Sequence, residues 1–112
     1  QNNILKAEEA FILNAHLIDN VINASWQIAA EHYLYKDSIR VSINNEAIAH
    51  EFILLDESVI NDEFFGESLV LQNTLVVRAV YNSTNLQNAI ITIEYQGCAA
   101  GKYCYPKQQQ NI

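Results

Sequence analysis

The sequence contains few of the residues on which several large classes of protein depend. Of its 112 residues only six are lysine or arginine, against thirteen aspartates and glutamates, and the basic residues form no run. Binding to nucleic acid requires clustered cations that neutralise phosphates, so we expect no nucleic-acid partner. No apolar run approaches the roughly 18 residues that a membrane span needs. We therefore expect a soluble domain that makes no direct contact with the membrane.

Glycine, proline and methionine are also scarce, with three, one and none. Half of the residues are apolar and 17% are charged, a balance typical of a folded chain. This length can form one apolar core, so we predict a single domain over residues 1–112. We expect the core over about residues 10–106, with the polar residues 107–112 beginning a tether. The absence of a starting methionine and of an export signal suggests a processed or excised segment.

Apolar and polar residues alternate along most of the chain, which is the pattern of half-buried β-strands. The clearest strands are expected over residues 21–28, 75–82 and 89–96. Shorter ones are expected over residues 11–17, 33–35, 38–43, 50–55 and 68–71. Turn-prone breaks lie at Asp19-Asn20, Asn44-Asn45, Gln72-Asn73 and residues 82–85. This pattern predicts an all-β, immunoglobulin-like antiparallel β-sandwich, with a small closed barrel as the alternative.

The only two cysteines, Cys98 and Cys104, are separated by five residues near the end of the chain. They end one expected strand and begin the next, so strand pairing would bring them close enough for a disulfide. In the chain-entropy model, closing so short a loop contributes ~2.4 kcal/mol at best, which is little for a structural bond. We interpret the pair as a dithiol that exchanges electrons. A disulfide that only pins the hairpin is the alternative.

Neither a metal nor another cofactor is predicted. Zinc bound to the two cysteines would need two further ligands. The three histidines, His16, His32 and His50, do not show ligand spacing relative to the cysteines. Each is expected to be an ordinary surface or edge residue.

A second unusual segment runs from Asn61 to Glu67, where Phe64 and Phe65 lie between carboxylates and Gly66. This composition is poor for a strand and for a helix. One interpretation is a loop that places one ring in the core. The sharper one is a mobile cover, in which one ring lies over a reactive sulfur and the glycine gives the loop a pivot.

Four blocks of sequence, taken together, carry a resemblance to a known family. They are Trp26-Gln27-Ile28 leading to Tyr33-Leu34-Tyr35 and Ile39-Arg40; Asp62-Glu63-Phe64-Phe65-Gly66; Tyr95-Gln96-Gly97-Cys98; and Cys104-Tyr105-Pro106. In this order and spacing, over roughly residues 10 to 108, they resemble the N-terminal periplasmic domain of the DsbD family of thiol:disulfide interchange proteins. On periodicity alone, Tyr33 and Tyr35 would be packing residues on one strand face.

The resemblance implies an immunoglobulin-like sandwich with the dithiol on a surface hairpin. It implies that Cys104 forms mixed disulfides with partners and that Cys98 resolves them. The cap loop would be formed by Asp62, Glu63, Phe64, Phe65 and Gly66, with Phe64 shielding the disulfide. The other residues around the sulfurs would be Tyr33, Tyr35, Tyr103 and Tyr105.

The resemblance also implies a periplasmic location, as part of an inner-membrane protein, and a set of partners. A thioredoxin-like C-terminal domain of the same parent would reduce this domain. This domain would then reduce disulfide isomerases of the DsbC and DsbG kind and a cytochrome c maturation thioredoxin. We further hypothesise that Asp62, Glu63 and partial burial raise the pKa of the Cys104 thiol. The rivals are a structural or adhesive periplasmic sandwich with an inert disulfide, and a sandwich that binds a small ligand.

Overall fold

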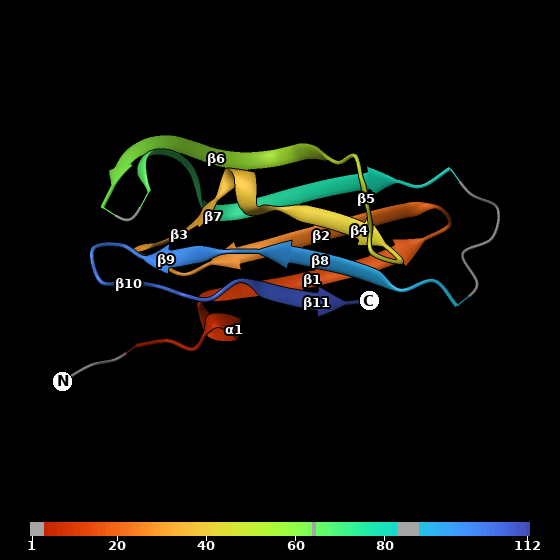
Figure 1. Cartoon of the computed structure of the whole chain (residues 1–112), viewed down its shortest axis with the longest axis horizontal. Coiled ribbons are helices and arrows are strands. Elements are labelled where there is room, and N and C mark those ends of the chain that lie inside the picture. Colours follow the sequence, from red (N-terminus) through yellow and green to blue (C-terminus); the bar gives the residue numbers. More distant parts are fainter. Residues whose placement is uncertain (1–3, 64, 83–87) are drawn as a thin grey trace.

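The computed structural model describes residues 4–63, 65–82 and 88–112, and these are mostly β-strand. One antiparallel sheet has the order β1-β2-β7-β3-β9-β10, with β6 also paired to β7; the other has the order β11-β8-β4-β5. The strands are β1 Phe11–Ile18, β2 Val21–Ile28, β3 His32–Tyr35, β4 Arg40–Ile43, β5 Glu46–Ile48, β6 Glu51–Asp62, β7 Gly66–Val80, β8 Ile91–Tyr95, β9 Gly97–Ala99, β10 Tyr103–Cys104 and β11 Gln108–Asn111. The two sheets lie face to face (Figure 1).

The core lies between the two sheets, as the alternation of the sequence predicts. On β2 the side chains of Ile22, Ala24 and Trp26 are buried, while the residues between them are more exposed. The Trp26 ring meets the ring of Tyr95, on β8 of the other sheet, edge to face with centroids 5.6 Å apart. The prediction of an antiparallel β-sandwich is therefore confirmed, and the chain forms two sheets instead of one closed barrel.

The longest strands differ from the prediction. β6 and β7 run over 12 and 15 residues and form one long hairpin, where the sequence predicts three shorter strands and a turn at Gln72-Asn73. Asn73 has a φ of 66° inside β7, and its side-chain amide donates to Asp56 on β6. Asparagine tolerates this backbone conformation, so the turn signal marks an irregularity within the strand. The predicted turn at this place was wrong.

Two other predicted turns are confirmed. Asp19 has a φ of 56° between β1 and β2, and Asn44 and Asn45 have φ values of 51° and 70° between β4 and β5. Positive φ at two successive residues is what a tight two-residue hairpin requires.

The last strand corrects another expectation. Residues 108–111 form β11, an edge strand paired with β8. Their polar composition predicts the start of a tether over residues 107–112 instead. An edge strand needs only backbone hydrogen bonds and tolerates exposed polar side chains, which is why composition alone misleads here.

Two short helices, α1 (Ala7–Ala10) and η1 (Lys36–Ser38), complete the described structure. No helix in the described ranges is long and apolar enough to cross a membrane. The molecule is elongated, with extents of 49 × 27 × 21 Å. At one end of its long axis, the tip of the β6–β7 hairpin and the β9–β10 turn lie near each other (Figure 1). The two cysteines lie at this end.

Candidate redox site

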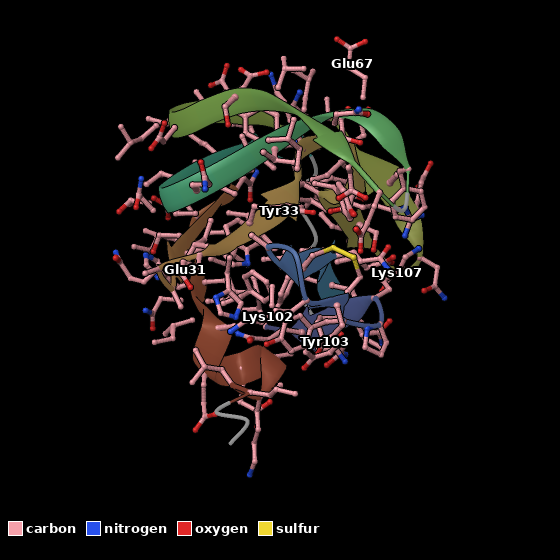
Figure 2. The ribbon with its side chains drawn as sticks, turned by 90° about the vertical axis from the view of Figure 1, so that its left-hand side faces the viewer. Glu31, Tyr33, Glu67, Lys102, Tyr103 and Lys107 are labelled. Carbon is pink, nitrogen blue, oxygen red and sulfur yellow. A yellow bond between two sulfur atoms is a disulfide. The ribbon has the colours of Figure 1, made fainter. Side chains whose placement is uncertain are left out.

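The two cysteines form a disulfide between β9 and β10. Cys98 and Cys104 lie directly opposite each other in the antiparallel register, with their Cα atoms 3.9 Å apart. Gly101, with a φ of 71°, allows the chain to reverse between them. The side chain of Cys98 is 0% exposed, whereas Cys104 is only half-buried. The bond lies near the β9–β10 turn (Figure 2), and Cys104 is the more exposed of its two residues.

Strand pairing places two tyrosines on the same face as the sulfurs. Tyr33 on β3 lies opposite Cys98 on β9, and cross-strand partners share a face of the sheet. Tyr35, two residues further along β3, lies on that face as well. Tyr33, Tyr35 and Cys98 form a small buried cluster with Val70, separate from the main core. Cys104 packs against this cluster.

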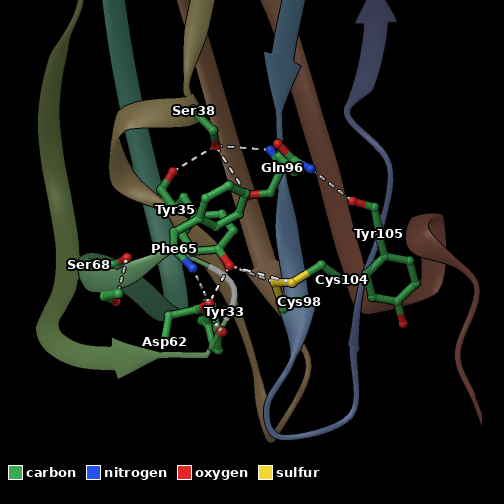
Figure 3. Close-up of a disulfide and its surroundings, with 11 residues drawn as sticks. Tyr33, Tyr35, Ser38, Asp62, Phe65, Ser68, Gln96, Cys98, Cys104 and Tyr105 are labelled. Atoms are coloured by element: carbon green, nitrogen blue, oxygen red, sulfur yellow. Dashed lines mark hydrogen bonds between the residues drawn. A yellow bond between two sulfur atoms is a disulfide. The ribbon is translucent and has the colours of Figure 1, made fainter.

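The Tyr35 hydroxyl connects the disulfide to a buried carboxylate. Its oxygen lies 3.0 Å from the Cys98 Sγ and 3.4 Å from the Cys104 Sγ (Figure 3). It donates a hydrogen bond to Oδ2 of Asp62 at 2.7 Å, and the Tyr33 hydroxyl donates to the same oxygen. Asp62 is 5% exposed at the end of β6, so these bonds replace most of its contact with water.

Both tyrosines keep their protons over the usual pH range. Burial, followed by the hydrogen bond to Asp62, raises the pKa of Tyr33 to about 12. The same two causes raise the pKa of Tyr35 well above its ordinary value. A tyrosinate beside a buried carboxylate would be doubly unfavourable, because it would be desolvated and close to a like charge. The site therefore presents neutral O–H donors to the sulfurs and to Asp62.

The predicted cap loop is the tip of the β6–β7 hairpin. Oδ1 of Asp62 accepts a hydrogen bond from the backbone N–H of Phe65 at 3.1 Å, and Gly66 turns the chain with a φ of 77°. The Phe65 ring is 63% exposed and meets the Tyr35 ring edge to face, with centroids 5.0 Å apart. Phe64, which the resemblance assigns as the shield, lies outside the described residues. Glu63 is exposed at the tip.

Tyr103 and Tyr105 have a different environment from Tyr33 and Tyr35. They flank Cys104 in sequence, and adjacent residues of an extended chain point to opposite faces. The Tyr105 hydroxyl donates to the carbonyl of Leu5 at 2.7 Å, and its ring packs on Phe11 and Tyr103 in the main core. The structure does not bring these two rings into the small cluster around the sulfurs.

Gly97 is a site residue that the sequence analysis misses. A Cβ atom at this position would lie 2.2 Å from the Tyr33 carbonyl oxygen and 2.8 Å from Cζ of Phe11. Only glycine therefore allows β9 to approach β3 this closely, and that approach places Cys98 opposite Tyr33. A glycine at the end of an alternating strand, directly before a cysteine, is the signal that could have identified it.

Ser38 is a second residue that the sequence does not single out. Its hydroxyl donates to the Tyr35 carbonyl at 2.7 Å and accepts the backbone N–H of Gln96 at 2.9 Å. It thereby joins the end of β3 to the residue between β8 and β9 (Figure 3). Next to it, a groove of about 590 Å³ opens between η1 and the hairpin tip, with Tyr35 and Phe65 among its lining residues.

A disulfide at one end of an antiparallel β-sandwich, with one cysteine buried and the other half-buried, places the chain in the class of β-sandwich domains that carry a disulfide on a terminal hairpin. The family of "Thiol:disulfide interchange protein DsbD, N-terminal" matches the chain over residues 1–112. The chain belongs to this family of DsbD N-terminal domains.

Individual relatives agree with this assignment. The thiol:disulfide interchange protein DsbD of Vibrio cholerae is 33% identical over 115 residues, and that of Escherichia coli K12 is 29% identical over 113 residues. Each comparison covers the whole of this chain but only 18% and 20% of the relative. The chain thus spans about a fifth of the length of the curated relatives that it matches.

Two solved structures from Neisseria meningitidis are similar in fold. The DsbD N-terminal domain in the reduced form matches with a TM-score of 0.84 and 26% identity, over 98% of this chain and 88% of that one. A complex between the DsbD N-terminal and the PilB N-terminal domains matches with a TM-score of 0.71 and 25% identity, over 99% of this chain and 88% of the other. The immunoglobulin-like fold expected from the sequence is confirmed by this likeness.

Proposed function

We propose that this domain is a two-electron relay that works through the Cys98–Cys104 pair. It accepts electrons from a thioredoxin-like C-terminal domain of its parent protein, in the periplasm at the inner membrane. It passes them to disulfide isomerases of the DsbC and DsbG kind and to a cytochrome c maturation thioredoxin. The observation that carries the proposal is the unequal burial of the two cysteines, with Cys98 fully buried and Cys104 only half-buried, because exchange needs one cysteine that a partner reaches and a second that completes the reaction.

The reduction of the domain takes place in two exchange steps. A partner thiolate attacks the accessible Sγ of Cys104, a mixed disulfide forms, and Cys98 leaves as a thiolate with the electron pair of the broken bond. The second partner thiolate then attacks the mixed disulfide and releases Cys104 as a thiolate. The partner ends with a disulfide and the domain with two thiols. The same steps in reverse pass both electrons to the next protein, with Cys104 attacking and Cys98 resolving.

The surroundings of the sulfurs support a reactivity that depends on the partner. Thioredoxin-like proteins hold their reactive cysteine at a helix N-terminus, whose dipole favours the thiolate. Here the sulfurs lie on a β-hairpin beside the buried carboxylate of Asp62, and a nearby negative charge disfavours a thiolate. The free reduced domain would thus react slowly, and a docked partner that displaces the hairpin tip would change this environment. The complex of a related domain with the PilB N-terminal domain is a precedent for such docking.

The test is to trap the mixed disulfide with a thioredoxin-like partner. We expect Cys98→Ala to accumulate a covalent complex through Cys104, visible on a non-reducing gel, whereas Cys104→Ala transfers no electrons to the partner. The oxidised wild-type domain should be reduced by the dithiol form of the same partner. An inert structural disulfide predicts the opposite for the wild type: the bond would stay oxidised in the presence of excess reduced partner, and the relay would be rejected.

A further inference from the structure

We propose that the Tyr35 hydroxyl receives the Cys98 thiolate when the disulfide opens, by turning its hydrogen from Asp62 to the sulfur. The inference rests on the proposed relay and concerns the half of the reaction that takes place out of reach of solvent. It assigns to Tyr35 a direct role in the exchange and to Tyr33 a different, supporting one.

The leaving sulfur needs such a donor because it is fully buried. Cys98 is 0% exposed, so water cannot solvate a thiolate formed there. Burial of a charge without a hydrogen-bonding partner is strongly unfavourable. Within the part of the chain that the structure describes, the Tyr35 hydroxyl is the one side-chain donor found within hydrogen-bond distance of this sulfur, at 3.0 Å.

The same hydroxyl already has another acceptor in the oxidised domain. A tyrosine has one O–H hydrogen, and a carboxylate accepts it far better than a disulfide sulfur does. The hydrogen therefore points to Oδ2 of Asp62 at 2.7 Å while the disulfide is closed. When the bond breaks, Cys98 gains a full negative charge and becomes a competitive acceptor without any movement of the backbone.

Asp62 can release Tyr35 because its other donors remain. Oδ2 keeps the hydroxyl of Tyr33, and Oδ1 keeps the backbone N–H of Phe65. The buried carboxylate therefore keeps two hydrogen bonds after the switch, and it keeps the Phe65 bond even where the Tyr33 hydroxyl is removed. Tyr33 thus plays a supporting role.

Among the described side chains that face Cys98, no cation is present to stabilise a thiolate there. Tyr33 and Tyr35 face it from β3, Cys104 from β10 and the carboxylate of Asp62 from the end of β6, with Glu63 beyond it at the tip. Besides Asp62, β6 and β7 contribute the apolar side chains of Ile60 and Val70 to the small cluster. None of these described groups is a cation. The raised pKa of Tyr35 keeps its proton in place, so the hydroxyl donates a hydrogen bond and transfers no proton.

The step is balanced without an added reagent. The partner sulfur bonds to Sγ of Cys104, the Cys98–Cys104 bond breaks, and both of its electrons remain on Cys98. The Tyr35 O–H bond stays intact and only changes its acceptor. In the reverse direction the same hydrogen bond holds the Cys98 thiolate before it resolves a mixed disulfide.

The ionisation of Cys98 can be measured alone in the reduced 112-residue chain carrying Cys104→Ser. The ¹³Cβ chemical shift of Cys98 is followed against pH, with and without Tyr35→Phe. Because a hydrogen bond to a charged group is stronger than one to a neutral group, we expect its loss to lower the acid dissociation constant of the Cys98 thiol at least about tenfold. Tyr33→Phe is the matched variant, since it removes a hydroxyl from the same carboxylate without a sulfur contact, and it should change the ionisation much less. Equal effects of the two variants, or no effect of Tyr35→Phe, would overturn the proposal.

A kinetic measurement separates this proposal from the relay itself. Reduction of the oxidised domain by dithiothreitol should slow at least about tenfold in Tyr35→Phe, while thermal unfolding of the oxidised form reports any loss of fold. This reagent needs no docking surface, so its rate tests Tyr35 even if no protein partner reduces the wild type. Failure of the wild type with protein partners would reject the relay and leave the Tyr35 result standing. An unchanged dithiothreitol rate in a folded Tyr35→Phe domain would reject the role of Tyr35 alone.

Discussion

The two bonded sulfur atoms have different surroundings, and the difference is set by single residues. Cys98 is fully buried on β9, which is paired on both sides, while Cys104 is half-buried on the two-residue edge strand β10, whose partner in the sheet is β9. The accessible sulfur is the one that a partner can attack in line. The buried sulfur is the better resolving group, since it is held close to any mixed disulfide on Cys104. The proposed division of roles thus follows from burial.

Near the site, Gly97 is the residue whose substitution we expect to destabilise the fold most. In Gly97→Ala the new Cβ would meet the Tyr33 carbonyl at 2.2 Å, and backbone cannot move aside as a side chain can. We expect a loss of about 3 kcal/mol in the free energy of unfolding, the upper part of the range for overpacking. Urea unfolding of the oxidised domain measures it.

Gly101 provides the matched control for this prediction. A Cβ at Gly101 meets nothing within 4 Å, so Gly101→Ala brings only the strain of its φ of 71°. That strain costs roughly 1–2 kcal/mol for a residue with a side chain. If Gly101→Ala proves as destabilising as Gly97→Ala, close approach of β9 to β3 is not the reason for the glycine at position 97.

Among the elements, the β6–β7 hairpin contributes both to the buried surroundings of the sulfurs and to the exposed surface beside them. Its inner side contributes Val70 and Asp62 to the sulfur cluster, and its tip places Phe65 on Tyr35. Asp62 is the link between strand and tip, because its two oxygens accept bonds from β3 and from the tip backbone. The hairpin tip is therefore tied to β3 by this carboxylate and by the contact of the Phe65 ring with Tyr35.

Removal of that carboxylate should loosen the tip specifically. In Asp62→Ala the Phe65 N–H and both tyrosine hydroxyls lose their acceptor, so we expect exchange of the Phe65 amide hydrogen to accelerate at least about tenfold, the equivalent of one such bond. Hydrogen exchange followed by NMR gives the rate. Glu63→Ala is the control, because Glu63 is an exposed carboxylate at the same tip. Similar acceleration in both variants would show that the hydrogen bond from Phe65 to Asp62 does not order the hairpin tip.

The elements that could be predicted from sequence are those buried on one face. β1 and β2 alternate because one side of each packs on the core. The sequence does not predict the length of the β6–β7 hairpin because Asp62 is the one buried residue of β6, so no apolar alternation marks the strand, and because Asn73 has the backbone conformation of a turn residue inside β7. The proximity of Tyr33 and Tyr35 to the sulfurs came from family resemblance, since periodicity does not determine which strands pair.

At the scale of the molecule, the redox site occupies one end of a domain 49 Å long. A partner could therefore reach Cys104 from this end of the domain alone, which suits the proposed relay. The net charge of -7 adds a long-range preference for partners with a basic face. Neither property depends on the chemistry of the sulfurs, and single-site variants at the cysteines leave both intact.

The buried tyrosines make the stability of the whole domain sensitive to alkaline pH. Burial is the first cause that raises the pKa of Tyr33 to about 12, and it also raises the pKa values of Tyr35, Tyr95 and Tyr105 above their ordinary value near 10. Above pH 10 the unfolded chain loses these protons while the folded domain keeps them. The stabilisation is thus complete below pH 10 and is lost as the pH rises toward 12 and beyond, by up to ~1.4 kcal/mol per pH unit for each tyrosine.

Urea unfolding of the oxidised domain at pH 9, 10 and 11 should show this decline. Tyr95 allows an independent check, since it lies in the core between Phe11 and Trp26, outside the sulfur cluster. Tyr95→Phe keeps the ring but removes the ionising group, so the decline above pH 10 should become shallower by up to ~1.4 kcal/mol per pH unit. A stability that stays constant from pH 9 to 11 would mean that tyrosine burial does not control the alkaline limit of the fold, whereas a decline of equal steepness in Tyr95→Phe would show that Tyr95 makes no contribution to it.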